Sequence, residues 1–494
     1  MTRELASTGI GGLDNVLGGG FSRGHLFLIE GEPGAGKTTV AMQFALAGAQ
    51  AGEKVLYITL SETEQEIREG AASHGWVIDD RVAVHELVPP ESLLNEENQQ
   101  SLLYSSDLEL GETAKDIIAV IERLRPSRVV IDSLSEIRLL AQSSLRYRRQ
   151  VLALKHHFAR FDTTVILLDD LTSEGHDRTM HSLTHCVIKL EQLAPEYGAE
   201  RRRLRVLKYR GSSYRGGYHD FSIKHGGVVV YPRLVAGEHR TLAPRERLKS
   251  GSPELNELLG GGIDQGSGTL VLGPAGTGKS LLALLFTKAA LDRGERAAVF
   301  IFDEELAQLR KRMAELGIDV DAAESSGQLH LQQIDAAEMS PGEFAHAVRA
   351  GVDSRDAKCV VIDSLNGYQA AMPDERLLIL HMHELLQYLN RRGASTFLTV
   401  AQHGLVGDMK TPIDITYLAD TVILLRYFEA LGKVRRAISV MKKRLGTHEN
   451  TIREYKIETS GLRIGPVIEG FQGILRGVPS FAGEPDALLT DGAS

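Results

Sequence analysis

The 494-residue sequence has little cysteine, no long apolar run and no excess of basic residues. Its two cysteines, Cys186 and Cys359, stand far apart in apolar surroundings. This excludes a disulfide framework and predicts buried thiols in a reducing compartment. No stretch approaches the roughly 20 apolar residues of a membrane helix, and residues 1–5 lack the apolar segment of a secretory signal. We therefore expect a cytoplasmic protein without a membrane partner.

The formal net charge of −9 argues against a broad nucleic-acid-binding surface. The run of arginines at 201–203 lacks interleaved aromatic residues and is interpreted as a solvated charge run. The histidines at 156–157, 381 and 383 lack the partner ligands of a zinc site. Nucleic acid is therefore not an expected partner, and no zinc site is predicted.

Two stretches, 31–38 and 273–280, fit the phosphate-binding pattern G-x-x-x-x-G-K-[ST]. An apolar run precedes each loop and a helical pattern follows it. In that context the backbone N–H groups and the helix N-terminus face the phosphates. We therefore expect ATP as the ligand of both loops. The predicted ATP-binding residues are Gly31, Gly34, Gly36, Lys37, Thr38, Thr39, Gly273, Gly276, Thr277, Gly278, Lys279, Ser280 and Leu281.

The two loops belong to a duplicated unit. A Leu-Gly-Gly-Gly segment precedes each loop, at 17–20 and 259–262, and an Ile-Asp-Ser-Leu segment follows, at 131–134 and 362–365. This is a tandem domain duplication and not a solenoid of short repeats. It predicts P-loop ATPase domains at 1–236 and 249–478, a linker at 237–248, and a flexible tail at 479–494 that could dock a partner.

Each copy alternates short apolar runs with helical patterns. In the first copy, 55–60, 129–131 and 164–168 are predicted strands, whereas 113–124 and 147–161 are predicted helices. This alternation indicates a mostly parallel sheet flanked by helices on both faces. Residues 202–231 have a period of two and several glycines, which predicts added antiparallel strands. The predicted fold class is therefore α/β, with two tandem P-loop NTPase domains.

Each copy also places carboxylates and hydroxyls where Mg²⁺ and ATP chemistry needs them. The residues predicted to hold Mg²⁺ are Thr38, Asp132, Ser280 and Asp363. For a strand-end aspartate, the alternative is a helix cap. Glu62 and Glu304 follow the strand after each P-loop helix, where a carboxylate can orient or deprotonate an attacking water. An exposed glutamate is common there, and only its recurrence in both copies favours catalysis.

A Lys-x-Arg pair occurs late in each copy, as Lys208 with Arg210 and as Lys442 with Arg444. On a strand, residues i and i+2 project to the same face. Both cations of a pair could therefore reach one phosphate, including that of a neighbouring subunit. The alternative is a solvated basic strand face.

From residue 5 to about residue 479, the sequence resembles KaiC and the KaiC-like tandem ATPases of the RecA superfamily. The resemblance rests on the segments above and on the run at 419–429, which continues through 436–438 to 452–454. It implies two RecA-like domains and a homohexameric double ring. ATP would lie between neighbouring subunits, and protein partners would bind at the ring faces. Contacts to the neighbour's phosphates would come from Lys208, Arg210, Lys442, Arg444 and His448.

The family's adjacent pair of catalytic glutamates is altered here. Ser61 and Asp303 stand at its first position, whereas Glu62 and Glu304 match the second. The resemblance thus implies catalytic roles for Glu62, Glu304 and Asp303. The N-terminal copy retains a single carboxylate, so the two copies need not hydrolyse ATP at the same rate.

The resemblance also implies autophosphorylation in the C-terminal domain. Thr416 and Tyr417 match the family's Ser-Thr pair, and Thr411 matches a nearby threonine. Tyr417 carries its hydroxyl farther from the backbone, which disfavours a two-site Ser/Thr cycle and leaves Thr416 as the favoured acceptor. The alternative is that Thr416 and Tyr417 pack against a subunit interface.

We therefore expect a Mg-ATP-dependent ATPase and Ser/Thr autokinase that forms a ring and acts as a signalling or clock-type switch. A second hypothesis is a signalling scaffold that binds ATP mainly to assemble. A third is a RecA-like DNA-stimulated ATPase, against which the net charge counts.

Overall fold

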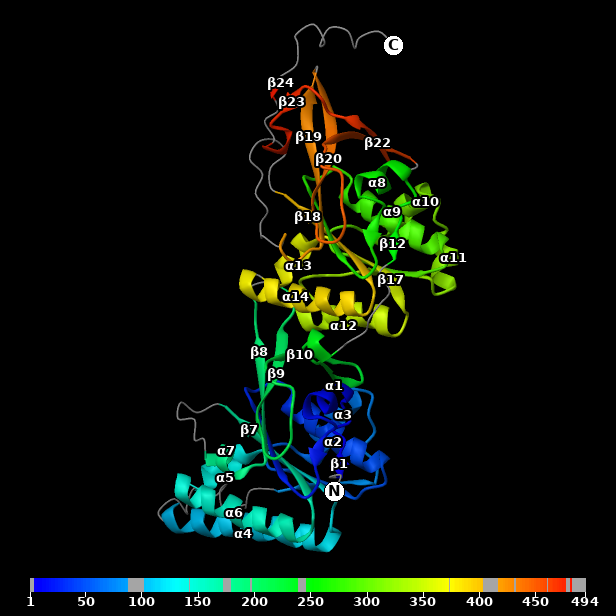
Figure 1. The fold of residues 1–494 in the computed structure, drawn as a ribbon. Helices are drawn as coiled ribbons and strands as arrows, with labels where there is room; N and C mark the ends of the chain where they lie inside the picture. The colour runs from blue at the N-terminus through cyan, green and yellow to red at the C-terminus, as the bar shows by residue number, and fades with distance from the viewer. Residues whose placement is uncertain are drawn as a thin grey trace. The chain divides into compact units, whose positions relative to one another are not determined.

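The computed structural model describes residues 4–87, 102–141, 143–171, 179–195, 198–238, 246–372, 374–402, 416–430, 432–459, 461–476 and 480–481. The chain divides into two compact units, Met1–Arg233 and Leu234–Ser494. Each unit is built on a nine-stranded sheet with helices on both faces, as Figure 1 shows. The predicted α/β fold of two tandem RecA-like domains is confirmed.

The first unit has six parallel strands and three antiparallel ones, in the order β11-β10-β9-β8-β3-β7-β6-β4-β5. The parallel strands are largely apolar and buried, as is typical of a sheet covered on both faces. The strands are β3 (Leu26–Gly31), β4 (Val55–Thr59), β5 (Val82–Glu86), β6 (Arg128–Asp132), β7 (Thr164–Asp170), β8 (Cys186–Leu193), β9 (Arg201–Tyr209), β10 (His219–Lys224) and β11 (Gly227–Tyr231). The predicted antiparallel addition is thus β9 to β11.

Helices divide between the two faces of this sheet. One hydrophobic core lies under α1 (Gly11–Leu17), α2 (Lys37–Gln50) and α3 (Glu64–Ser73). The other lies under α4 (Leu102–Leu124), α5 (Leu134–Ala141) and α6 (Ser144–Arg160), the cyan layer in Figure 1. A short helix α7 (Thr179–Leu183) precedes β8, and a hairpin of β1 (Leu5–Ala6) and β2 (Phe21–Ser22) leads into β3. The segment predicted as a helix at 113–124 is the last half of α4.

The second unit repeats this plan, in the order β16-β15-β17-β18-β14-β19-β20-β21-β22. Its strands are β14 (Gly268–Gly273), β15 (Arg296–Ile301), β16 (Leu329–Gln333), β17 (Ala357–Asp363), β18 (Ser395–Ala401), β19 (Thr421–Ala430), β20 (Lys433–Lys443), β21 (Arg453–Glu458) and β22 (Gly461–Val467). One face carries α8 (Pro253–Leu258), α9 (Lys279–Asp292), α10 (Leu306–Glu315) and α11 (Val320–Ser325). The other carries α12 (Pro341–Asp353), α13 (Leu365–Ala371) and α14 (Glu375–Arg391).

Two predicted boundaries differ in detail from the structure. Leu234 and Ala236 pack into the core of the second unit, ahead of the predicted linker at 237–248. A hairpin of β12 (Arg247–Leu248) and β13 (Ile263–Asp264) opens the second repeat. In the predicted tail, β24 (Ser480–Phe481) pairs with β23 (Phe471–Gln472), so these two residues belong to the folded unit.

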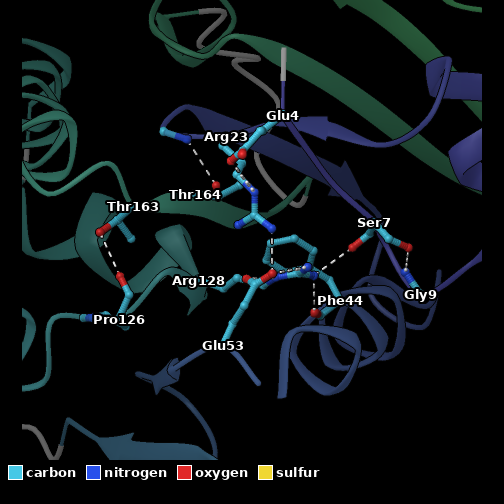
Figure 2. Close-up of polar contacts among 11 residues, drawn as sticks. Glu4, Ser7, Gly9, Arg23, Phe44, Glu53, Pro126, Arg128, Thr163 and Thr164 are labelled. Atoms are coloured by element: carbon cyan, nitrogen blue, oxygen red, sulfur yellow. Dashed lines mark hydrogen bonds and ion pairs between the residues drawn. The ribbon is translucent and has the colours of Figure 1, made fainter. Parts of the chain in front are cut away.

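One buried position that differs between the two units is occupied by an arginine in the first. Arg128 is only 2% exposed and donates to the Glu53 carboxylate and to the carbonyls of Ser7 and Phe44 (Figure 2). Glu53 also accepts from Arg23 at 2.7 Å. In the second unit the matching strand position is Cys359, because Cys359 pairs with β15 as Arg128 pairs with β4. Burial raises the pKa of the Cys359 thiol to about 12.

Candidate nucleotide sites

The two P-loops have the same backbone geometry. Each joins the central strand, β3 or β14, to the helix α2 or α9. The residues before these helices, Gly36 and Gly278, have φ values of 94° and 89°. Only glycine adopts such values without strain. A Cβ atom on Gly36 would also lie 2.7 Å from Ile223 Cδ1. Both loops thus present a helix N-terminus at the carboxyl edge of the sheet, where anions bind favourably.

The P-loop lysines differ in their partners. Lys37 Nζ donates to the carbonyls of Gly31 and Glu32 at 3.0 Å each, and lies 2.6 Å from Asp170 Oδ1. Lys279 Nζ donates to the carbonyl of Pro274 at 2.9 Å. Burial lowers the pKa of Lys279, and Asp363 opposes that shift. By strand register, the second unit has Ala401 at the place of Asp170, so this ion pair belongs to the first site alone.

In the first unit, the predicted metal residues Thr38 and Asp132 are in contact. Thr38 Oγ1 donates to Asp132 Oδ2 at 2.9 Å, and the Tyr57 hydroxyl donates to the same oxygen at 2.7 Å. Burial raises the pKa of Asp132, whereas these two hydrogen bonds lower it. The site therefore contains a carboxylate and a hydroxyl beside the P-loop lysine.

In the second unit, Asp363 is held differently. It accepts a hydrogen bond from Thr399, one strand nearer to the P-loop. The next residue, Ser364, donates to Asp303 Oδ2 at 2.6 Å. Asp303 is thereby tied to the residue that directly follows Asp363. Ser280 is half-buried at the start of α9, whereas Leu281 is buried in the hydrophobic core. Thr277 is also buried, with its hydroxyl on the Pro274 carbonyl.

The two predicted catalytic glutamates have different surroundings. Burial, Asp132 and Glu66 raise the pKa of Glu62, in that order of importance. A raised pKa brings a carboxylate closer to the range of a general base at neutral pH. Glu304 instead forms an ion pair with Arg312 on α10. Asp303, in contrast, contacts Ser364, the residue directly after Asp363.

Each Lys-x-Arg pair binds backbone carbonyls of the segment just before the sixth parallel strand. Lys208 donates to the carbonyl of His181, and Arg210 donates to that of Ser182 at 2.7 Å. In the second unit, Lys442 donates to the carbonyls of Thr416 and Ala419 at 3.0 and 2.9 Å. Arg444 donates to the carbonyl of Tyr417 at 2.5 Å. By strand register, Thr416 and Tyr417 are the counterparts of His181 and Ser182.

The remaining predicted residues lie around this segment. Tyr417 is 52% exposed. His448 follows β20 in a loop that packs on the Leu-Gly-Gly-Gly segment, where a Cβ atom on Gly260 would lie 1.8 Å from the Thr447 carbonyl oxygen. Thr39 is half-buried in the first turn of α2. Thr411 lies outside the described residues.

The two units thus repeat one strand, loop and helix arrangement, with lysine, hydroxyl and aspartate at matching places. The model of the KaiC ATPase family matches residues 6–235 and 248–469. The chain belongs to the KaiC ATPase family. Each family match spans nearly one whole unit, so the resemblance seen in the sequence is confirmed.

Individual relatives match the KaiC-family chain over nearly its full length. It is 28% identical to the "Circadian clock protein KaiC3" of Synechocystis sp., over 99% of this chain and 97% of the relative. It is 27% identical to the "Circadian clock oscillator protein KaiC" of Acaryochloris marina, over 96% and 91%. The KaiC of Thermostichus vulcanus is 28% identical, over the same 96% and 91%. Within the described residues, no helix combines the length and apolarity needed to cross a membrane.

Sequence reasoning missed two groups of the first site in this KaiC-family chain. Asp170 binds the P-loop lysine, and Tyr57 binds the predicted metal aspartate. Both occupy parallel strands next to β6. The Asp169-Asp170 pair at the end of an apolar strand was a visible signal, because carboxyl ends of neighbouring parallel strands meet at one edge. Tyr57 carried no signal, since a tyrosine within a buried strand resembles ordinary core.

A further pair links the first P-loop strand to α7. His181 Nε2 lies 2.8 Å from Glu30 Oε2. Glu30 directly precedes the P-loop, and the carbonyl of His181 accepts from Lys208. In the second unit Leu272 stands at the place of Glu30 and Thr416 at that of His181. The first unit therefore has a polar connection from its P-loop strand to its Lys-x-Arg pair, and the leucine at the matching place of the second unit cannot form one.

Proposed function

We propose that this protein binds and hydrolyses Mg-ATP, assembles into a homohexameric double ring, and autophosphorylates its C-terminal unit on Thr416. Membership of the KaiC ATPase family supports ATP chemistry in both units. The relatives' names speak of a circadian clock, and we propose a switch of that kind here. Its output would be a change of ring shape that alters the binding of protein partners.

The P-loop lysines would bind the β- and γ-phosphates, replacing their present carbonyl and carboxylate partners. Thr38 with Asp132, and Ser280 with Asp363, offer the oxygen ligands that Mg²⁺ prefers. Their chemistry therefore fits the ion, which would neutralise phosphate charge. Glu62 in the first unit, and Glu304 with Asp303 in the second, would orient or deprotonate the attacking group.

The observation that carries the autokinase proposal is a pair of hydrogen bonds. Lys442 donates to the carbonyl of Thr416, and Arg444 donates to that of Tyr417. If these cations also contact a neighbour's phosphates, the acceptor hydroxyl is held beside the triphosphate. In the transfer, the Thr416 oxygen would bond to the γ-phosphorus while the bond between the γ-phosphorus and the ADP oxygen breaks. A carboxylate, for which Glu304 is the candidate, would take the hydroxyl proton.

The test is incubation of the purified full chain with γ-labelled ATP, followed by mapping of phosphate by mass spectrometry. We expect released phosphate, and label on Thr416 that depends on Lys279 but not on Lys37. Label on Thr411 or Tyr417 instead would move the acceptor. Phosphate release without any protein label would contradict the autokinase and leave the ATPase.

The second candidate is an ATP-assembled scaffold with negligible phosphate transfer. The observation that favours it is the ion pair of Glu304 with Arg312, which already engages this carboxylate. Sedimentation with and without ATP distinguishes the two functions. If Lys279→Ala abolishes only assembly, and the wild type carries no label, the scaffold is supported. Stimulation of hydrolysis by DNA would instead support a RecA-like DNA-dependent ATPase.

A further inference from the structure

A pocket of about 340 Å³ lies at the amino ends of β3 and β8, the edge of the first sheet opposite its P-loop. We call it the amino-end pocket. Its polar lining consists of His25, Lys155, His185 and Arg210, and its other lining residues are apolar or glycine. The rings of His25 and His185 lie against each other, with centroids 4.0 Å apart. Four nitrogen-bearing side chains, three beside strand ends and one on α6, therefore surround one cavity.

The lysine and the arginine that line this pocket are both cations. Lys155 and Arg210 donate to the carbonyls of Leu183 and Ser182, and neither forms an ion pair with any carboxylate in the part of the chain that the structure describes. Burial and Arg210 lower the pKa of Lys155. The nearby Asp162 lies beside Gly24, where its charge acts on Arg23. The cations thus repel each other and would gain from an anion.

The second unit has different residues at the matching place. By strand register and by the shared helix end, Leu386 stands at the place of Lys155 and Asp420 at that of His185. Leu386 is buried, and its Cδ2 would lie 3.7 Å from a Cβ atom on Gly268. Asp420 accepts hydrogen bonds from the backbone N–H of Gly268 at 3.0 Å and from Arg444 at 3.2 Å. A carboxylate of the chain thus already satisfies this arginine.

We propose that the amino-end pocket binds a phosphate group, which supplies the negative charge that Asp420 supplies in the second unit. Lysine and arginine donate strong, charge-assisted hydrogen bonds to phosphate oxygens, and the imidazoles of His25 and His185 can donate as well. The phosphate has two possible sources, a free anion or a nucleotide held by a neighbouring copy. Only the second source rests on the ring proposed above, so phosphate binding can be tested apart from it.

The test uses the full chain with Lys37→Ala and Lys279→Ala, which removes the P-loop lysines as competing phosphate ligands. Inorganic pyrophosphate is titrated by calorimetry, and we expect one equivalent to bind. Lys155→Leu and His185→Asp introduce the residue types of the second unit. Each should weaken binding by about tenfold or more, because a charge-assisted hydrogen bond is lost.

Matched controls make the same chemical changes on the exposed surface of α6. Arg160→Leu and His156→Asp lie outside the pocket lining and should leave pyrophosphate affinity unchanged. Equal weakening by these controls would overturn the proposal, since it would show a general charge effect. Absence of pyrophosphate binding in the background protein would overturn it as well.

A second measurement uses the wild type and does not depend on variant folding. Lys155 is acetylated with an amine-reactive reagent, and its modification is followed by mass spectrometry. With free pyrophosphate as the source, protection appears on adding pyrophosphate to separated or assembled chains. With a neighbour's nucleotide as the source, ATP alone protects Lys155, and only in the assembled fraction. Protection under neither condition contradicts phosphate binding.

Discussion

A Cβ atom on Gly48 would lie only 2.5 Å from Cδ of Arg128. The glycine at position 48 of α2 therefore leaves the space that the buried Arg128 of β6 occupies. The second unit has Ala290 and Cys359 at these places, a larger helix residue facing a smaller strand residue. In both units, the combined size of the helix residue and the strand residue thus fits the space between α2 and β6 or between α9 and β17.

Gly48→Ala should destabilise the first unit by about 2 kcal/mol, because Arg128 must shift and lose hydrogen bonds to Glu53 or Phe44. Trp76 is the single tryptophan of the chain and packs against the core of this unit. Its fluorescence during denaturant unfolding reports the effect. The control is Gly70→Ala on α3, where a Cβ atom meets nothing within 4 Å. It should be neutral or stabilising, since alanine favours helix.

Glu53 should make the stability of the first unit depend on pH. Burial raises its pKa, but hydrogen bonds from Arg128 and Arg23 outweigh this and lower the pKa to about 2 from 4.5. Because the pKa of Glu53 is lower in the folded than in the unfolded protein, its ionised carboxylate stabilises the fold at any pH above about 4.5. This contribution, about 3 kcal/mol, is lost as the pH falls from about 4.5 to about 2. Trp76-monitored unfolding of Glu53→Gln should lack this pH-dependent component. Glu4→Gln, at an 88% exposed side chain, should retain it.

Asp170→Ala should tighten ATP binding at the first site. Lys37 must leave Asp170 to bind phosphate, and the second unit has alanine at that place. Removing a partly exposed ion pair is worth about 1 kcal/mol, or roughly a fivefold change in Kd. A fluorescent ATP analogue, titrated in a Lys279→Ala background, isolates this site. The reciprocal change, Ala401→Asp in a Lys37→Ala background, should weaken the second site. Weaker binding by Asp170→Ala would show instead that the carboxylate assists the ligand.

Tyr57→Phe should shift the Mg²⁺ requirement of the first site toward higher pH. Burial already raises the pKa of Asp132, and the Tyr57 hydroxyl opposes that shift with a hydrogen bond of 2.7 Å. Without the hydroxyl, the carboxyl stays protonated to a higher pH and is a poorer Mg²⁺ ligand there. The pH dependence of Mg²⁺-supported ATP binding, in a Lys279→Ala background, measures this. An unchanged profile would mean that Asp132 is not the metal ligand.

The features that the sequence predicted correctly are those that depend on repeated motifs and their spacing. Glycine-rich loops after apolar strands and the strand-end aspartates occur where they were expected, because local chemistry determines them. The sequence did not predict the contact of Asp170 with Lys37 or the burial of Arg128, since these contacts join segments far apart in the sequence. Nor could spacing tell that Glu304 pairs with Arg312 while Asp303 accepts a hydrogen bond from Ser364. Side-chain direction at a strand end depends on tertiary packing, which a single sequence does not display.

Lys442→Met should reduce phosphate transfer to Thr416 more than it reduces assembly. The Lys442 ammonium holds two carbonyls of the acceptor segment, those of Thr416 and Ala419. A methionine keeps the length of the side chain but cannot donate, so the acceptor loses its fixed position. Since misplacement by about 1 Å can cost a hundredfold in rate, phosphate on Thr416 should become barely detectable by mass spectrometry. Lys208→Met is the control, because it makes the same change in the first unit and should leave Thr416 phosphorylation intact. Assembly of both variants is compared by sedimentation with ATP. The contrary outcome is that both variants lose assembly and Thr416 phosphorylation to the same extent. These lysines would then act only at the interface between subunits, and the hydrogen bond of Lys442 to the Thr416 carbonyl would have no part in the transfer.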